Sequence, residues 1–397
     1  MSVTKKTRKA PQRGFSNEEL LERLNSIQTR MSQSGVGALL LTTEADIYYF
    51  TGFLSQFWQS PTRPWFVVVP ASGKPIAVIP EIGASCMNNG FMEDIRTWSS
   101  PHPMDDGVSL LASSVIEVLE ISNDKKLGLN QGRETHLRMP LSDYQQFREL
   151  LKNKIELVDA TEIIRQQRMV KSETEIDKIR YVAQCASDVF ESPSSFAQTG
   201  MRTEEVFRAF KIACLNAGVD DVSFLVGGAN QGGYDDIISP PTSRALTKGD
   251  VLILDTGCTF DGYFCDFDRN YGIESASDSA LKAYDVLWQA TEAGLAVAKP
   301  GNRCCDIFNA MNDVMAAGGA LGESVGRFGH GLGIQLTEPP SHTSWDQTVL
   351  EAGMVITLEP GMYYKPKKMM VHEENLVIRE EAPELLSRRA AQEMPII

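Results

Sequence analysis

The stretch that decides the fold runs from Ile253 to Tyr271 and reads Ile-Leu-Asp-Thr-Gly-Cys-Thr-Phe-Asp-Gly-Tyr-Phe-Cys-Asp-Phe-Asp-Arg-Asn-Tyr. Its Asp-Gly pair at 261–262, flanked by aromatic and β-branched residues, is a strong signal for a β-hairpin with a two-residue loop. Such a loop sets the register, so Asp255 is predicted opposite Asp268, and Gly257 opposite Asp266. Because side chains alternate along a strand, the three aspartates then share one face of the hairpin.

Three carboxylates on one face repel one another unless a cation lies between them. Hard divalent ions favour oxygen ligands, so a metal site is our preferred interpretation of this face. The alternative is a polar, solvated face of an ordinary hairpin. Other parts of the chain must decide between the two.

The composition limits the class of protein. A chain of 397 residues is long for a single core, so two domains are predicted. The net charge of −14 argues against a nucleic-acid surface. Seven scattered cysteines do not suggest a disulfide framework, which favours free thiols, Cys258 and Cys265 included, and a cytoplasmic location. Without a run of eighteen apolar residues, we expect no membrane span.

The pattern of strands and helices predicts where the domains divide. A basic tail over 1–14 is expected to be disordered. Strands near 37–41, 65–70, 75–80 and 126–129 alternate with helices near 17–32, 80–89, 106–121 and 140–152, which predicts an α/β domain over 15–168. A capping box, Ser172 to Glu175, starts the second domain, 169–397. Within that domain we expect a helix over 203–217 and a strand over 222–226.

Three further candidate ligands follow the hairpin. His330 lies between glycines in Arg327-Phe-Gly-His-Gly-Leu-Gly333, where a ligand can approach the ring closely. Glu359 ends an apolar strand over 354–358, a poor place for a charge without a partner. Glu374 lies in a strand predicted over 370–378, where it shares a face with His372 and Glu373 points the other way.

Taken in order, these motifs resemble a known family. Leu-Asp-Thr-Gly at Asp255, the aspartate at 266, Gly-His-Gly-Leu-Gly at His330, Leu-Glu-Pro-Gly at Glu359 and Glu-Asn-Leu-Val at Glu374 are similar to those of the pita-bread metallohydrolases, peptidase family M24. That family includes aminopeptidase P, prolidase, methionine aminopeptidase and the metal-free creatinase branch. The resemblance implies an α+β fold, in which a C-terminal pita-bread catalytic domain follows a smaller creatinase-like α/β domain.

The resemblance also implies a site with two divalent metal ions. Asp255 would bind one ion, His330 and Glu359 the other, and Asp266 and Glu374 would bridge them. Mn²⁺ suits these ligands best, with Fe²⁺, Co²⁺ or Zn²⁺ as alternatives. The implied reaction is hydrolysis of an Xaa-Pro-like peptide or amide C–N bond by a metal-bridging hydroxide, with Glu359 as proton shuttle.

The sequence departs from the family at two histidines that are thought to orient substrate. The segment 231–241 has no histidine, and the position seven residues after His330 is Thr337. Asp268 stands where relatives often have threonine, and His372 where they often have arginine, so both are catalytic candidates. Tyr234, Asp235 and Thr337 are candidates for substrate binding. The alternative for the acids is a solvated loop residue, and the alternative for His372 is a residue that holds a metal ligand in position. Arg269 is expected to organise the ligands through a salt bridge.

Creatinase-like relatives dimerise with the first domain near the neighbouring site. We therefore expect a homodimer in which Arg63 and Trp65, from an aromatic loop, reach the partner's site; the alternative is a packed surface loop. The substrate is expected to be a short peptide or a small molecule.

Three other functions compete with peptide hydrolysis. They are a non-peptide C–N hydrolase like creatinase or ectoine hydrolase, a dimethylsulfoniopropionate lyase, and a non-catalytic binding module. Gly257 counts against the lyase, whose relatives carry an aspartate there. The five ligand positions count against a binding module, because non-catalytic relatives typically lose them.

Overall fold

The structure is a computed structural model that describes residues 8–60, 63–322 and 326–397. The chain divides into two compact units, Gln12–Arg168 and Met169–Ile397, and residues 8–11 group with the second. Each unit has a hydrophobic core of its own. They are described separately below.

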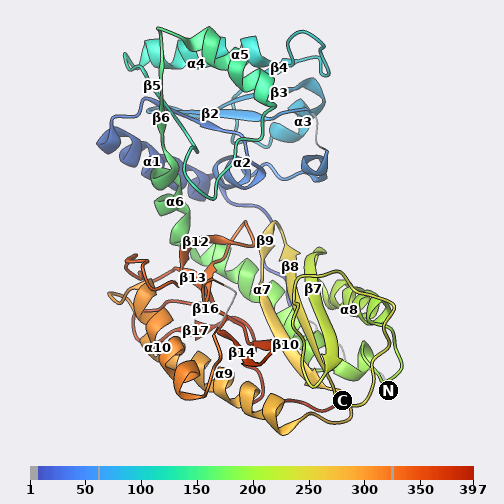
Figure 1. Cartoon of the computed structure of the whole chain (residues 1–397). Coiled ribbons are helices and arrows are strands. Elements are labelled where there is room, and N and C mark those ends of the chain that lie inside the picture. The colour runs from blue at the N-terminus through green and yellow to red at the C-terminus, as the bar shows by residue number, and fades with distance from the viewer. Residues whose placement is uncertain (1–7, 61–62, 323–325) are drawn as a thin grey trace. The chain divides into compact units, whose positions relative to one another are not determined.

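The first unit is built on a six-stranded mixed sheet with the order β4-β3-β2-β1-β5-β6. Its strands are β1 (Ala38–Leu41), β2 (Phe66–Pro70), β3 (Ile76–Pro80), β4 (Asp94–Trp98), β5 (Lys126–Leu129) and β6 (Glu156–Asp159). Its helices are α1 (Asn17–Ser34), α2 (Glu44–Thr51), α3 (Ala84–Met87), α4 (Val108–Ile121), α5 (Leu141–Leu151) and α6 (Thr161–Met169). Helices α4 and α5 cover one face of the sheet, and α1 and α2 lie on the other (Figure 1).

The four strands predicted in this unit are confirmed to within a residue at each end. Helix α1 extends two residues beyond the predicted end and is capped by Gly35. Gly35 has a φ of 63°, a left-handed conformation that glycine adopts without strain. Helices α2 and α6 and strands β4 and β6 were not predicted; each is nine residues long or shorter.

The second unit contains four helices and three sheets among the residues described. The helices are α7 (Glu173–Phe190), α8 (Thr203–Ala217), α9 (Asp278–Val297) and α10 (Cys304–Ala317). The strands are β7 (Asp221–Gln231), β8 (Asp250–Phe260), β9 (Tyr263–Phe264), β10 (Phe267–Gly272), β11 (His330–Gly331), β12 (Glu338–Ser341), β13 (Val355–Leu358), β14 (Gly361–Lys365), β15 (Lys368–Val371), β16 (Glu374–Val377) and β17 (Glu384–Leu385). The sheet orders are β10-β8-β7, with β9 on β8; β12-β11-β13-β16-β17; and β14-β15. Helix α7 packs on β8, α8 on β7, and α9 on β13, β14 and β15 (Figure 1).

The central hairpin has the predicted register. Asp268 pairs with Asp255 and Phe260 with Tyr263, which leaves Asp261 and Gly262 as the two loop residues. Both loop residues have positive φ, 50° and 79°, as the mirror-image hairpin turn requires. The tip is fixed to α7, because the buried Lys178 ammonium lies 2.7 Å from the Asp261 carboxylate.

Strand pairing differs from the prediction near the C-terminus. The single strand expected over 370–378 is two strands, β15 and β16, which pair with different partners. His372 and Glu373 lie between them, where the His372 backbone N–H donates to the carbonyl of Pro360. The capping box is as predicted: the Ser172 side chain accepts from the Glu175 N–H, and the Glu175 side chain accepts from the Ser172 N–H.

The expected disordered tail is only partly open to description, since residues 1–7 lie outside the described residues. Residues 8–14 are described, and the Arg8 guanidinium lies 3.4 Å from the Asp188 carboxylate of α7; the disorder of the tail stays a prediction. No helix within the described ranges is long and apolar enough to span a membrane. All seven cysteines are free thiols, as predicted.

Candidate metal centre

The hairpin contributes three aspartates to a buried cluster. Asp255 on β8 and Asp268 on β10 face each other across the two strands. Asp266 lies immediately before β10. Its backbone N–H donates to Oδ1 of Asn375 at 2.9 Å, and the side-chain amide of Asn375 donates to the backbone carbonyl of Asp266. The Asn375 side chain therefore fixes the backbone of Asp266 to β16.

His330 brings an imidazole to the same cluster. Its Nδ1 lies 2.9 Å from the carbonyl oxygen of Gly331. The two atoms form a hydrogen bond when Nδ1 carries the hydrogen. The lone pair of Nε2 is then directed towards Asp266 and Glu359, at 3.5 and 3.7 Å. Burial lowers the pKa of His330 to about 4, so the ring is neutral at pH 7, as a metal ligand must be.

Two glutamates complete the cluster. Glu359 follows β13, and its backbone N–H donates to the carbonyl of Phe328. The second is Glu373, whose carboxylate lies within 4.8 Å of ligand atoms of Asp266 and His330. Because Glu373 stands in the break between β15 and β16, its side chain leaves the strand towards the cluster.

Glu374, expected as the bridging ligand, has protein partners of its own. Its carboxylate accepts from Arg269 at 3.0 Å, from Arg389 at 3.2 Å, and from the backbone N–H of Ala390 at 2.8 Å, and it also bonds to the Ser387 hydroxyl. Both oxygens of this carboxylate are therefore occupied by protein donors, and Glu374 is not part of the group formed by Asp266, His330 and Glu373. The two glutamates point to opposite sides, as the alternation predicted, and the side chain that faces Asp266 and His330 is that of Glu373.

His372, expected to be catalytic, lies on the side of Glu374. Its Nδ1 is 3.1 Å from the Thr291 hydroxyl and its Nε2 is 3.5 Å from Arg389. Burial lowers the pKa of His372 well below its ordinary value, so the ring is neutral. The geometry makes His372 a neighbour of Arg389, not of the cluster.

The cluster has oxygens without hydrogen-bond partners among the described residues. They are Oδ1 of Asp255, Oδ2 of Asp268 and Oε1 of Glu373, and all three atoms are buried. Burial raises the pKa of Asp255 to about 7 and of Glu359 to about 8. Buried carboxylates that lack donors are costly unless a cation binds them, so this ligand set fits divalent metal ions.

Arg269 organises the cluster from behind, as predicted. Its guanidinium donates to the carbonyls of Asp268, Glu373 and Arg388 and to the Glu374 carboxylate. It thereby joins β10 to the segment that carries Glu373.

Tyr234 also has a role other than the one expected. It is 2% exposed, and its hydroxyl donates to Asn270 Oδ1 at 2.7 Å and accepts from the Val371 N–H at 3.1 Å. Both hydrogen bonds are internal, and they use the only hydrogen that the Tyr234 hydroxyl can donate. It holds Asn270, which lies two residues after Asp268.

The other substrate candidates are exposed. Asp235 lies in the loop after β7, and Thr337 lies at the bend before β12. Thr337 precedes Glu338, whose carboxylate is paired with the buried Lys171 ammonium at 3.0 Å. Direct contact of Asp235 or Thr337 with a substrate stays a prediction.

In the first unit, Trp65 is 2% exposed and packs against Phe53 and Trp58, with ring centroids 5.2 and 5.9 Å away. Trp65 therefore belongs to an aromatic core and cannot reach a partner's site, because its ring is covered. Arg63, which follows the undescribed residues 61–62, lies over the ring of Phe57 at 5.4 Å.

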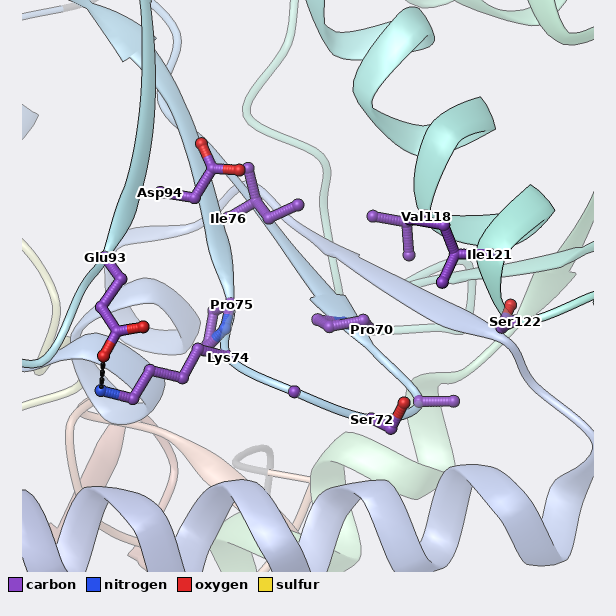
Figure 2. Close-up of a pocket in the computed structure, with 12 residues that line it drawn as sticks. Pro70, Ser72, Lys74, Pro75, Ile76, Glu93, Asp94, Val118, Ile121 and Ser122 are labelled. Atoms are coloured by element: carbon purple, nitrogen blue, oxygen red, sulfur yellow. Dashed lines mark hydrogen bonds and ion pairs between the residues drawn. The ribbon is translucent and has the colours of Figure 1, made fainter.

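A pocket of about 240 Å³ lies in the first unit, beside the turn from β2 to β3 (Figure 2). Its wall is largely apolar, from Pro70, Ile76, Val118 and Ile121. The two acids in its lining are already neutralised, since Glu93 pairs with Lys74 and Asp94 with Arg96, each at 2.7 Å. This pocket offers no free carboxylate for a metal or for catalysis.

Two residues near the cluster were not predicted to matter. Asn375 lies two residues after Glu373, and this short spacing was the feature of the sequence that could have indicated its role. His342 is fully buried, and neither ring nitrogen has a hydrogen-bond partner among the described residues. Burial lowers the pKa of His342 to about 3, so the ring is neutral at pH 7.

Two known protein families match the two units of the chain. Residues 177–381 match the description "Metallopeptidase family M24", and residues 23–170 match "Creatinase/Prolidase N-terminal domain". The chain is 26% identical to "Probable dipeptidase PepE" of Mycobacterium tuberculosis over 367 residues, 92% of this chain and 93% of the relative.

Solved structures have the same fold. The dipeptidase PepE of Mycobacterium ulcerans is similar with a TM-score of 0.82 at 24% identity, over 97% of this chain and 99% of that one. The prolidase of Thermococcus sibiricus is similar with a TM-score of 0.84 at 22% identity, over 95% and 99%. The fold is therefore the creatinase-type domain followed by the pita-bread domain, and the chain belongs to metallopeptidase family M24.

Proposed function

We propose that this metallopeptidase is a hydrolase with two divalent metal ions that cleaves the C–N bond of short, Xaa-Pro-like peptides. The observation that carries the proposal is the convergence of one imidazole and four carboxylates in one buried cluster. The proposed ligands are Asp255, Asp266, His330, Glu359 and Glu373. The printed names of relatives, dipeptidase and prolidase, support a peptide substrate.

The donor set supports a particular class of ion. Four carboxylates and one imidazole suit Mn²⁺, Fe²⁺, Co²⁺ or Zn²⁺, and the excess of oxygen favours Mn²⁺. When bound, two such ions lower the pKa of water to about 7 and polarise a carbonyl oxygen. Asp255 would hold one ion, His330 and Glu359 the other, and Asp266 and Glu373 would bridge.

Glu359 is the proposed proton shuttle. The side chain of Glu359 is 21% exposed to solvent, whereas the side chains of His330 and Asp266 are 4% and 7% exposed. An acid at the open edge of the cluster can take a proton from water and pass it to the leaving nitrogen. The buried Asp266 has no such access.

A second candidate is hydrolysis of a small, non-peptide amide or amidine. It is favoured by the two positions where peptidases of the family carry histidine. Thr337 is exposed and has no imidazole, and in the loop after β7 the Asp236 carboxylate accepts from the N–H groups of Ile238 and Ser239, so it caps its own turn. Neither position offers a group that could stabilise an oxyanion as an imidazole does.

One experiment separates the candidates. The protein is stripped of metal, reloaded with Mn²⁺ and assayed against Xaa-Pro dipeptides, matched dipeptides without proline, and guanidino and cyclic amidine compounds. Peptide hydrolysis predicts metal-dependent turnover of dipeptides, fastest with proline. Turnover of the non-peptide compounds alone would favour the second candidate, and turnover that persists without metal would refute both.

The remaining proposals concern the particle itself. Free thiols throughout the chain support a reducing, cytoplasmic setting. A homodimer is proposed from the family resemblance, with Arg63 as the residue that approaches the partner's site. Light scattering should give twice the chain mass of 43.9 kDa. A fully active monomer would contradict it.

A further inference from the structure

Asp268 is a carboxylate of the cluster to which the five-ligand set gives no task. It lies inside β10, directly opposite Asp255 on β8. Only 1% of its surface is exposed. The hairpin register therefore forces a second buried carboxylate against the first.

The side chain of Asp268 is almost without donors. Its Oδ1 meets only the Asn270 amide, at 3.4 Å, and its Oδ2 has no hydrogen-bond partner within the described part of the chain. The nearest cation, Arg269, contacts the backbone carbonyl of Asp268 and forms its ion pair with Glu374. The charge of Asp268 is thus not matched by the protein.

The neighbours of Asp268 explain what would match it. Asp255, directly opposite on β8, is itself a carboxylate with a buried oxygen that lacks a partner among the described residues. Two buried carboxylates that face each other can both stay ionised only if a cation is shared between them; without a cation, at least one of them binds a proton. The unpartnered Oδ1 of Asp255 and Oδ2 of Asp268 supply two oxygens from opposite strands for such a cation.

We propose that Asp268 is an additional oxygen ligand for the metal ion held by Asp255, and that it makes this half of the centre selective for a hard ion such as Mn²⁺ over Zn²⁺. Zn²⁺ is satisfied by four ligands with nitrogen or sulfur among them, whereas Mn²⁺ prefers more oxygens. The other half, with His330, keeps its nitrogen donor. The inference rests on the proposed function, because it needs a metal at Asp255.

The first test asks whether the side chain at 268 touches the metal. Asp268→Cys is loaded with Co²⁺, because a thiolate bound to Co²⁺ absorbs strongly in the near ultraviolet. Asp313→Cys is the matched control, since Asp313 is an exposed acid on α10. The absorption of the wild-type protein, with its seven native thiols, is subtracted from both.

The expected result is a charge-transfer band in Asp268→Cys and none in Asp313→Cys. Bound Co²⁺ without that band in a folded Asp268→Cys would overturn the inference and leave the proposed function intact. A wild-type protein that binds no Co²⁺ or Mn²⁺ would instead defeat the proposed function.

A second test covers the case in which Asp268→Cys does not fold. Metal-stripped Asp268→Asn is titrated with Mn²⁺ and with Zn²⁺ by calorimetry. The variant should bind Mn²⁺ at one of two sites at least about 10-fold more weakly than wild type, with a smaller change for Zn²⁺. Unchanged Mn²⁺ affinities would overturn the inference. If the KM rose at the same time, Asp268 would instead bind a cationic group of the substrate.

Discussion

Two adjacent glutamates in this protein have opposite tasks. Glu373 reaches the metal cluster, and Glu374 neutralises Arg269 and Arg389. The side chains are chemically alike, so only their surroundings separate them. Each therefore fails differently when its charge is removed.

We predict that Glu373→Gln lowers both metal content and turnover by more than about 100-fold while the fold persists, because a ligand is lost. Metal analysis of the purified protein and the peptide assay measure this. Glu374→Gln should instead lower the free energy of unfolding by about 3–5 kcal/mol, because it leaves a buried guanidinium unpaired. If Glu374→Gln lost its metal without losing stability, the assignment of the two glutamates would be reversed.

The metal-stripped protein should depend on pH in an unusual direction. Burial raises the pKa of Asp255 to about 7 and of Glu359 to about 8, above their ordinary values near 4. Groups with raised pKa bind more protons folded than unfolded, so their contribution to stability is lost as pH rises through about 7–8. Metal binding releases those protons, so Mn²⁺ should raise Tm more at about pH 8 than at about pH 5.5. An equal increase in Tm with Mn²⁺ at both pH values would contradict the assignment of Asp255 and Glu359 as metal ligands.

At the scale of elements, the site depends on how the hairpin and β16 are joined. Asn375 makes two hydrogen bonds to the backbone of Asp266. Arg269 makes the parallel connection from β10 to the carbonyl of Glu373. Two ligands far apart in sequence are thereby fixed by backbone contacts.

We expect Asn375→Ala to weaken metal binding by about 10–100-fold, since it frees the backbone of a ligand without touching its carboxylate. The measurement is a metal titration of the stripped variant. Asn309→Ala, an exposed position on α10, is the control and should bind metal as wild type does. Equal affinities in the two variants would show that Asn375 does not position Asp266.

At the scale of the whole molecule, the two units have separate cores, and the proposed metal ligands all lie in the second unit. A ligand that binds only the folded form stabilises the unit that holds it. Calorimetry of the whole chain should therefore show two transitions, and Mn²⁺ should raise only one of them. A single transition, or two that shift together, would mean that the units unfold cooperatively.

The strongest local patterns predicted much of this fold. The Asp261-Gly262 turn fixed the register that sets Asp255 against Asp268, because two loop residues leave one way to pair the strands. The capping box at Ser172 marked the first helix of the second unit. Short elements such as α2 and β6 were missed, because their burial comes from neighbours far away in the chain.

The sequence by itself determined which residue types converge, since carboxylates next to strand ends and a histidine between glycines have few other uses. It did not determine which of Glu373 and Glu374 faces the metal. That choice depends on the break between β15 and β16 and on the guanidinium groups of Arg269 and Arg389 behind Glu374. Alternation along a strand tells which side chains share a face, but only packing in three dimensions tells what that face meets.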